Sequence, residues 1–140
     1  MRQNNRFIAN VEAVGKIIWL MGQSDAHRDH SVADLHRVIL PPVALQQYRI
    51  WEHDGYPVGF MSWGLFDEET EAGYLNGTRL IQPDDWNKGE KLWLVDFIAP
   101  FGGVREILRD SRNHFIKMFG KGVVAGTRRS SRGKIWYAVA

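Results

Sequence analysis

The chain has 140 residues, of which 44% are hydrophobic and 12% aromatic, and its formal net charge is +2. This length and apolar content suffice for one hydrophobic core, so we expect a single domain over residues 1–140 rather than a disordered segment. No apolar run approaches the roughly 20 residues of a membrane-spanning helix. The chain lacks cysteine, which excludes disulfides, thiolate zinc sites and a cysteine nucleophile. Because we find no export signal, we expect a cytoplasmic protein.

The N-terminal third has helical periodicity. Residues 7–21 predict one amphipathic helix. Its expected buried stripe consists of Phe7, Val11, Val14 and Ile18, widened by Ile8 and Ile17. Residues 22–30 are polar and predict a loop. Ser31 and Asp34 have the spacing of a capping box, which predicts a second helix that ends at Pro41-Pro42.

Strand patterns begin after this helix. Polar and apolar residues alternate over residues 47–53, and Asp54-Gly55 is the signal of a two-residue hairpin turn. We therefore expect a partner strand over residues 57–63. The acidic stretch 67–75, followed by Gly77, predicts a short helix.

The second half contains a nearly continuous apolar run, residues 92–99, which predicts a central strand buried on both faces. Residues 100–103 break this strand, and residues 104–119 return to helical spacing. Residues 123–127 and 134–139 predict two further strands. This order of elements predicts an α+β fold, an α/β sandwich in which helices cover the faces of one sheet.

Asp96 is the one charged residue in the apolar run 92–99. A buried carboxylate without a partner costs several kcal/mol, so a cation or several hydrogen-bond donors must lie nearby. One interpretation is a structural ion pair with an arginine. The other is a carboxylate that orients a histidine or stabilises a charge formed during a reaction. The pattern alone leaves both open.

His27 lies in the polar loop that follows the first helix. A neutral imidazole accepts a proton near pH 7, so His27 is a candidate general base, although a solvated loop histidine fits the same pattern. Ser24 could fix the ring by a hydrogen bond or could cap local backbone. His27 and His30 could be two ligands of a metal, but no third ligand has suitable spacing, so we expect no metal site.

Phe101-Gly102-Gly103 leads from the apolar strand into a helix. A glycine-lined helix start offers backbone N–H groups and a partial positive charge to a phosphate, although such turns can also be purely structural. The last twenty residues carry basic side chains without a carboxylate, and these could attract an acidic partner or form a solvated face. These basic residues are Lys121, Arg128, Arg129, Arg132 and Lys134.

Taken together and in order, these motifs resemble the RTX toxin-activating lysine acyltransferases over roughly residues 11–137. The most specific match is the run from Trp93 to Gly102, which reads Trp-x-x-Asp-x-Ile-Ala-Pro-Phe-Gly. A second match is Ser24-x-x-His27-Arg28. Further matches are Leu40-Pro41-Pro42, Gln47-Tyr48, Asp54-Gly55-x-Pro57, Ser62-Trp63, Tyr74-Leu75, Asp84-Asp85-Trp86-x-x-Gly89 and Arg132-Gly133-Lys134-Ile135. The loop departs from the family pattern at Asp25-Ala26 and Asp29-His30.

The resemblance implies a single acyltransferase domain with a fold like that of the GCN5-related N-acetyltransferases, a mixed sheet flanked by helices. It implies transfer of a fatty acyl group from acyl-acyl carrier protein to internal lysines of an RTX protoxin. It also implies that His27 and Asp96 are the essential histidine and aspartate, and that Ser24 is the serine of the first motif. We expect His27 to act as the base and Asp96 to hold its ring or stabilise its cation; an acyl-enzyme route through His27 stays open.

No tightly bound cofactor is expected, because the donor is the phosphopantetheine thioester of the acyl carrier protein. We expect the donor to contact Phe101, Gly102, Gly103 and Arg128. The expected partners are the acyl carrier protein, the RTX protoxin and a second copy of the chain in a homodimer, but not nucleic acid. Two other functions stay open: an acyltransferase that uses acyl-coenzyme A on another amine, and a non-catalytic binding module whose C-terminal basic residues touch nucleic acid.

Overall fold

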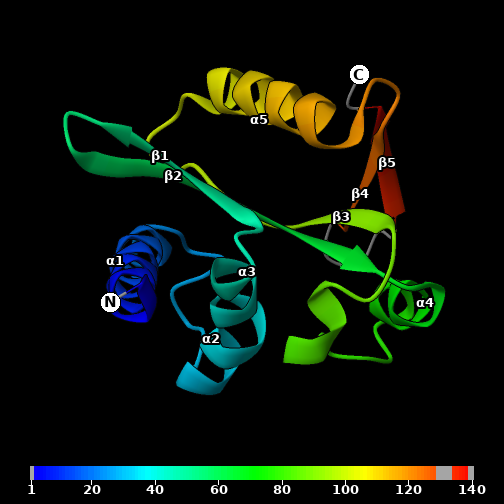
Figure 1. Ribbon diagram of the computed structural model, residues 1–140. Helices are drawn as coiled ribbons and strands as arrows, with labels where there is room; N and C mark the ends of the chain where they lie inside the picture. The colour runs from blue at the N-terminus through cyan, green and yellow to red at the C-terminus, as the bar shows by residue number, and fades with distance from the viewer. Residues whose placement is uncertain (1, 129–133, 139–140) are drawn as a thin grey trace.

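The computed structural model describes residues 2–128 and 134–138, with side chains described from residue 10 to residue 127. Five strands form one sheet in the order β1-β2-β3-β4-β5 (Figure 1). Neighbouring strands pair antiparallel except β3 and β4, which are parallel, so the sheet is mixed. The strands are β1 (Tyr48–His53), β2 (Tyr56–Phe66), β3 (Lys91–Ile98), β4 (Val124–Arg128) and β5 (Lys134–Ala138).

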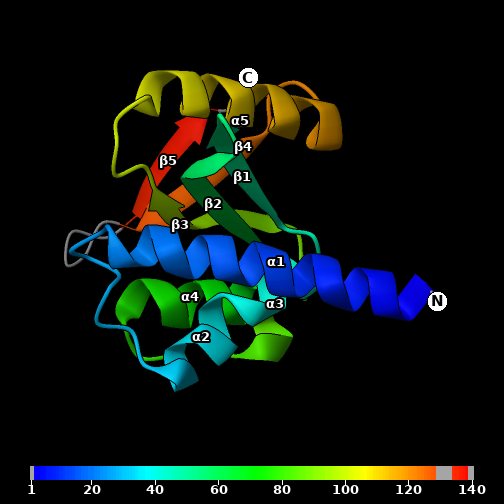
Figure 2. The same cartoon turned by 90° about the vertical axis from the view of Figure 1, so that its left-hand side faces the viewer.

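Helices cover both faces of this sheet. Four of them lie on one face and α5 lies on the other (Figures 1 and 2). The helices are α1 (Arg2–Gly22), α2 (Val32–Val38), α3 (Leu40–Ala44), α4 (Glu68–Asn76) and α5 (Val104–Phe119), with a short 3-10 helix at Pro83–Trp86. The predicted α+β class, a mixed sheet flanked by helices as in GCN5-related N-acetyltransferases, is therefore confirmed.

Apolar side chains fill the space on both sides of β2 and β3. Under α1 to α3 the buried cluster consists of Ala13, Ile17, Leu20, Met21, Ile39, Val43, Phe60 and Ile98. Beside it, near α4, lie Phe66, Tyr74, Ile81, Trp86 and Trp93. The cluster under α5 consists of Met61, Trp63, Leu92, Phe115 and Ala125. The apolar run of β3 is thus explained by burial on both faces, as predicted.

The buried face of α1 agrees with the prediction in part. Val14 and Ile17 pack on the core as expected, and the side chains of Phe7 and Ile8 lie outside the described residues. Val11 and Ile18 of the predicted stripe are 54% and 44% exposed. The side chains of α1 that enter the core are Ala13, Ile17, Leu20 and Met21. The helix has apolar residues on two opposite sides, and periodicity alone cannot choose between them.

The predicted end of the second helix is also wrong. Its start is correct, because the Ser31 N–H donates to Asp34 Oδ2 (2.9 Å) and the Asp34 N–H donates to Ser31 Oγ (3.1 Å). However, α2 ends at Val38, and Pro41 and Pro42 lie in the first turn of α3. The N–H groups of a first turn have no partner within the helix, so proline is tolerated there.

The other predicted elements agree with the structure. The hairpin turn has positive φ at Asp54 (51°) and Gly55 (82°), as a two-residue turn of this type requires, and β2 continues past residue 63. Asp67 caps α4, and Gly77 ends it with φ of 68°. Among the described residues, no helix is both long and apolar enough to cross a membrane. The cytoplasmic location and the extent of the domain stay predictions.

Asp85 is a fully buried carboxylate between α4 and β3. Its oxygens accept hydrogen bonds from Arg79 Nη2 (2.6 Å), Lys88 Nζ (3.0 Å) and the Gln82 N–H (2.8 Å). Burial alone would raise the pKa of Asp85, but these hydrogen bonds outweigh it and hold the pKa below its usual value. The network fixes this segment beneath the sheet.

We expect Asp85→Asn to lower the free energy of unfolding by about 2–3 kcal/mol, because hydrogen bonds to a charged acceptor are lost while the donors stay in place. Urea unfolding of the variant and the parent measures this. Glu69→Gln is the matched control, since Glu69 also lies near Arg79 (4.0 Å) but its side chain is 87% exposed. Equal losses in the two variants would contradict the role of Asp85.

A second polar network attaches α5 to β1. Arg49 Nη2 donates to Asp110 Oδ2 (2.8 Å), and Trp51 Nε1 donates to the same oxygen (2.8 Å). Arg49 Nη1 lies 3.2 Å from His114 Nδ1. A guanidinium can only donate, so this contact requires an unprotonated Nδ1. Burial, and then the charge of Arg49, lower the pKa of His114.

Since the pKa of His114 is lower in the folded chain than the reference value near 6.5, the unfolded state binds a proton first as the pH falls. We therefore expect the free energy of unfolding to decrease through about pH 6.5, and to level off below the folded pKa. Chemical unfolding from pH 7.5 to 5.5 tests this against His114→Gln, which keeps an acceptor but does not titrate. The prediction fails if the two chains have the same pH dependence. Asp110, whose pKa is also lowered, loses its contribution at more acidic pH.

Candidate active site

The loop after α1 begins at a buried helix end and is closed by hydrogen bonds between its own backbone groups. Leu20 and Met21 are buried at the end of α1. The carbonyl oxygen of Ser24 accepts hydrogen bonds from the N–H groups of His27 and Arg28, both at 3.0 Å. These turns close the loop and bring the side chains of Ser24 and His27 together.

Strand β3 carries a β-bulge next to Asp96. Ser62 of β2 pairs with Asp96, but Trp63 pairs with Leu94, so Val95 is an extra residue in β3. Trp93 and Ile98 are five residues apart, yet both pack on the α1 to α4 face. A regular strand would send residues five apart to opposite faces. Because Asp96 is two residues from Ile98, its side chain points toward the face of the α1–α2 loop.

Three predicted site residues meet at this point. Ser24 Oγ lies 2.7 Å from His27 Nδ1, and His27 Nε2 lies 3.1 Å from Asp96 Oδ1. The side chains of His27 and Asp96 are each 14% exposed, so the pair is largely shielded but reachable from solvent. Among the side chains that the structure describes, the partner of Asp96 is therefore a histidine from a segment 69 residues away, and not an arginine.

The hydrogen bonds indicate which ring nitrogen is protonated. An ionised Asp96 can only accept, so Nε2 of His27 carries the hydrogen in this contact. In the neutral ring Nδ1 is then unprotonated and accepts from the Ser24 hydroxyl. The nitrogen that can take up a proton is thus Nδ1, beside Ser24.

Two neighbours of this group were not predicted as site residues. Ser62 is fully buried, and its Oγ accepts a hydrogen bond from the backbone N–H of Asp96 (3.2 Å), which steadies the strand at the bulge. Ser62 could have been recognised in the sequence as a polar residue within an apolar strand, by the reasoning that singled out Asp96. His30 stacks on His27, with ring centroids 5.7 Å apart. Within the part of the chain that the structure describes, no three metal-ligating side chains gather.

The predicted donor-binding residues lie further along the chain, after β3. Phe101 is 56% exposed and contacts Trp19 of α1, with ring centroids 5.8 Å apart. Gly102 and Gly103 have φ of 91° and 72°, conformations that favour glycine, and they lead into α5. The first turn of α5 contains Glu106, whose charge would oppose a phosphate there. The side chain of Arg128 lies outside the described residues, as do those of Arg129, Arg132 and Lys134.

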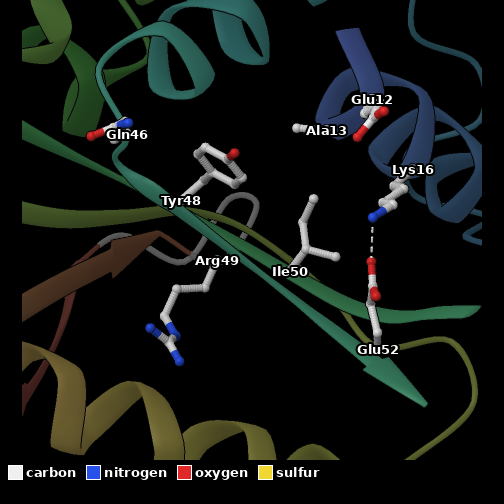
Figure 3. A pocket seen from close by; sticks show the side chains of 8 residues that line it. All are labelled: Glu12, Ala13, Lys16, Gln46, Tyr48, Arg49, Ile50 and Glu52. Carbon is white, nitrogen blue, oxygen red and sulfur yellow. Dashed lines mark ion pairs between the residues drawn. The ribbon is translucent and has the colours of Figure 1, made fainter. Parts of the chain in front are cut away.

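A shallow pocket of about 470 Å³ lies elsewhere, between α1 and the outer edge of β1 (Figure 3). Its lining consists of Glu12, Ala13, Lys16, Gln46, Tyr48, Arg49, Ile50 and Glu52. Lys16 and Glu52 form an ion pair across it. Tyr48 is separated from Asp96 by β2, because both residues pair with Ser62. The pocket shares no residue with the Ser24–His27–Asp96 group, whose hydrogen-bonded histidine is the better candidate for chemistry.

A histidine hydrogen-bonded to a carboxylate is an arrangement that can accept a proton during a reaction. The sequence is similar to the RTX-II toxin-activating lysine-acyltransferase ApxIIC of Actinobacillus pleuropneumoniae, with 34% identity over 89% of this chain and 78% of the relative. It is 36% identical to the leukotoxin-activating lysine-acyltransferase LtxC of Aggregatibacter actinomycetemcomitans, over 82% of the chain and 66% of the relative. Identity to the protein-lysine myristoyltransferase HlyC of Escherichia coli is 33%, over 75% of the chain and 60% of the relative.

The model of the RTX toxin acyltransferase family matches residues 7–136. The chain belongs to this family. The predicted enzyme class, an acyltransferase, is therefore confirmed, and the non-catalytic binding module loses its support.

We expect ¹⁵N NMR at neutral pH to find His27 with hydrogen on Nε2 and none on Nδ1, because Asp96 accepts from one side and Ser24 donates from the other. Asp96→Ala should shift the ring toward a mixture of tautomers. The exposed His36 is the internal control, since its ring signals should not change in that variant. Hydrogen on Nδ1 of His27 in the parent protein would contradict the assignment.

Proposed function

We propose that this enzyme transfers a fatty acyl group from an acyl carrier protein thioester to internal lysines of an RTX protoxin, with His27 as the base. The observation that carries the proposal is the hydrogen-bonded group Ser24–His27–Asp96 in a member of this family. Several relatives are named toxin-activating lysine-acyltransferases or protein-lysine myristoyltransferases, which supports the choice of acceptor and of a fatty acyl group.

The reaction forms a C–N bond and breaks a C–S bond. The neutral lysine amine attacks the thioester carbonyl carbon, and the tetrahedral intermediate expels the thiolate of phosphopantetheine. A lysine with a reference pKa near 10.4 first releases one proton to water to become this neutral amine, and its nitrogen loses a second proton as the amide forms. In our proposal Nδ1 of His27 accepts this proton, directly or through the Ser24 hydroxyl, and the proton then passes to the thiolate.

Asp96 has two tasks in this scheme. Before proton transfer, its carboxylate accepts from Nε2 and holds the ring in the tautomer whose Nδ1 is basic. After proton transfer, the same carboxylate lies against an imidazolium and stabilises its charge. The hydrogen bond from the Asp96 N–H to Ser62 keeps the strand in position during both stages. Asp96 therefore acts on the histidine, while His27 acts on the substrate.

The donor arm fits best near the end of β3. The described ladder between β3 and β4 has two residue pairs, Trp93 with Gly126 and Leu94 with Thr127, although β3 continues to Ile98. The strand edge beyond Leu94 is thus not covered by this ladder, on the stretch that includes Asp96. We propose that the phosphopantetheine arm approaches along this edge and past Gly102-Gly103, where glycine lets another molecule come close to the backbone.

The partners follow from the same scheme. We propose that the acyl carrier protein, an acidic partner, docks on the basic C-terminal residues, among them Arg128 and Lys134, in a salt-dependent manner. A homodimer stays part of the proposal. No resident cofactor is required, because the thioester arrives with the carrier protein.

The test uses the purified chain, acyl carrier protein loaded with a fatty acyl group, and a lysine-bearing RTX protoxin, with the mass gain of the protoxin as readout. We expect His27→Ala to reduce the rate about 10²–10⁴-fold, the usual contribution of a general base. Asp96→Asn should reduce it by a smaller factor, because the ring keeps a polar neighbour. His53→Ala is the matched control, since the His53 side chain is 80% exposed at the hairpin turn.

Full activity of His27→Ala would contradict the assignment of His27 as the base. Replacing the carrier protein donor with acyl-coenzyme A tests the donor separately. Equal rates with the two donors would reject the carrier protein as the specific donor and leave the acyltransferase chemistry intact.

A further inference from the structure

Helix α1 has a second apolar side that faces away from the core. Val11, Ile18 and Trp19 are 54%, 44% and 45% exposed. At 100° per residue, positions 11, 15, 18 and 19 share one side of the helix, opposite the buried Ile17. This outer stripe, defined by Val11, Gly15, Ile18 and Trp19, extends for about 12 Å along the helix at about 1.5 Å per residue.

Gly15 lies in the middle of the outer stripe. A Cβ atom added at Gly15 would meet nothing within 4 Å, so no neighbour in the described structure requires a glycine there. Glycine also destabilises a helix interior relative to alanine. Between Val11 and Trp19 the stripe therefore has one position, Gly15, without a side chain.

The stripe ends near the C-terminal end of α1, shortly before the loop that carries His27. The ring of Trp19 contacts Phe101, with centroids 5.8 Å apart. Trp19 precedes the loop that carries His27, and Phe101 follows the strand that carries Asp96. The same two segments are therefore joined twice, once by the aromatic pair and once by the His27–Asp96 hydrogen bond. The C-terminal part of α1, which carries Trp19, is therefore attached to the segment that follows Asp96.

We propose that the outer stripe binds the fatty acyl chain of the donor, with the carbonyl carbon at His27, the first methylenes on Trp19 and Phe101, and the tail over Gly15. This inference rests on the proposed acyl-transfer function. An acyl chain is apolar along its length and gains from leaving water wherever it meets apolar surface. Gly15, which has no side chain to block the path, then sets how far the chain can extend, and Trp19 is a specificity-determining residue.

The experiment compares transfer from acyl carrier protein loaded with butyryl or with myristoyl, using Gly15→Leu and Trp19→Ala in the full chain. We expect both variants to lower kcat/KM for myristoyl about tenfold relative to butyryl, because only the long chain reaches the altered surface. Met118→Ala is the matched control: Met118 is 43% exposed, on the opposite face of the sheet, and should leave the ratio unchanged. Circular dichroism checks that Gly15→Leu folds, as the open space around Gly15 predicts.

A second readout does not depend on catalysis. Calorimetric titration with myristate should show binding to the parent chain and weaker binding to Gly15→Leu and Trp19→Ala. If the parent transfers neither acyl group but still binds myristate through the stripe, the proposed function fails and the acyl site stands. An unchanged myristoyl-to-butyryl ratio in both variants overturns the acyl site. The acyl site is also overturned if, in sedimentation, the parent is a dimer and the only change in the variants is that they are monomers. In that case a second copy of the chain covers the stripe.

Discussion

The hydrogen bond between His27 and Asp96 depends on one extra residue in β3. Trp93 and Ile98 must both reach the same side of the sheet, where each belongs to a buried cluster, although they are five residues apart. The bulge at Val95 makes this possible, and it leaves Asp96 on the side that faces the α1–α2 loop. Ser62 Oγ then accepts a hydrogen bond from the backbone N–H of Asp96, which holds the irregular strand in register. The position of the carboxylate is thus a consequence of how the core packs.

Two carboxylates in this chain are held by different kinds of partner. Asp85 is hydrogen-bonded to Arg79 and Lys88, and the guanidinium of Arg79 keeps its positive charge at any physiological pH. Asp96 instead faces an imidazole, which can gain and lose a proton under the same conditions. Asp85 therefore suits a structural role, whereas Asp96 suits a site where charge appears and disappears.

Sequence patterns predicted the fold class and most elements, and the resemblance to the family brought Ser24, His27 and Asp96 together as one group. The patterns singled out Asp96 because a charge within an apolar run requires a partner. They did not single out Asp85, which is more deeply buried, because Asp85 lies in a polar segment that has the composition of an exposed turn. The composition of a short segment does not reveal burial when the residues that cover it are distant in the sequence.

The errors have related physical causes. Val11 and Ile18 of α1 were wrongly expected to be buried because two sides of the helix are apolar, and only the rest of the fold determines which one is covered. Pro41 and Pro42 were read as a helix end although the same chemistry also suits a helix start. The bulge at Val95 has no sequence signature of its own. It arises because Trp93 and Ile98 pack into two clusters on the same face of the sheet.

The sequence separation within the site has a consequence for synthesis of the chain. The loop that carries His27 is made early, and Asp96 follows 69 residues later. A growing chain that has left the ribosome only as far as α4 contains the histidine but not the carboxylate, nor the strand that positions it. The reacting group can therefore assemble only after β3 has entered the sheet beside β2, and a truncated or half-folded chain holds its histidine without the partner that orients it.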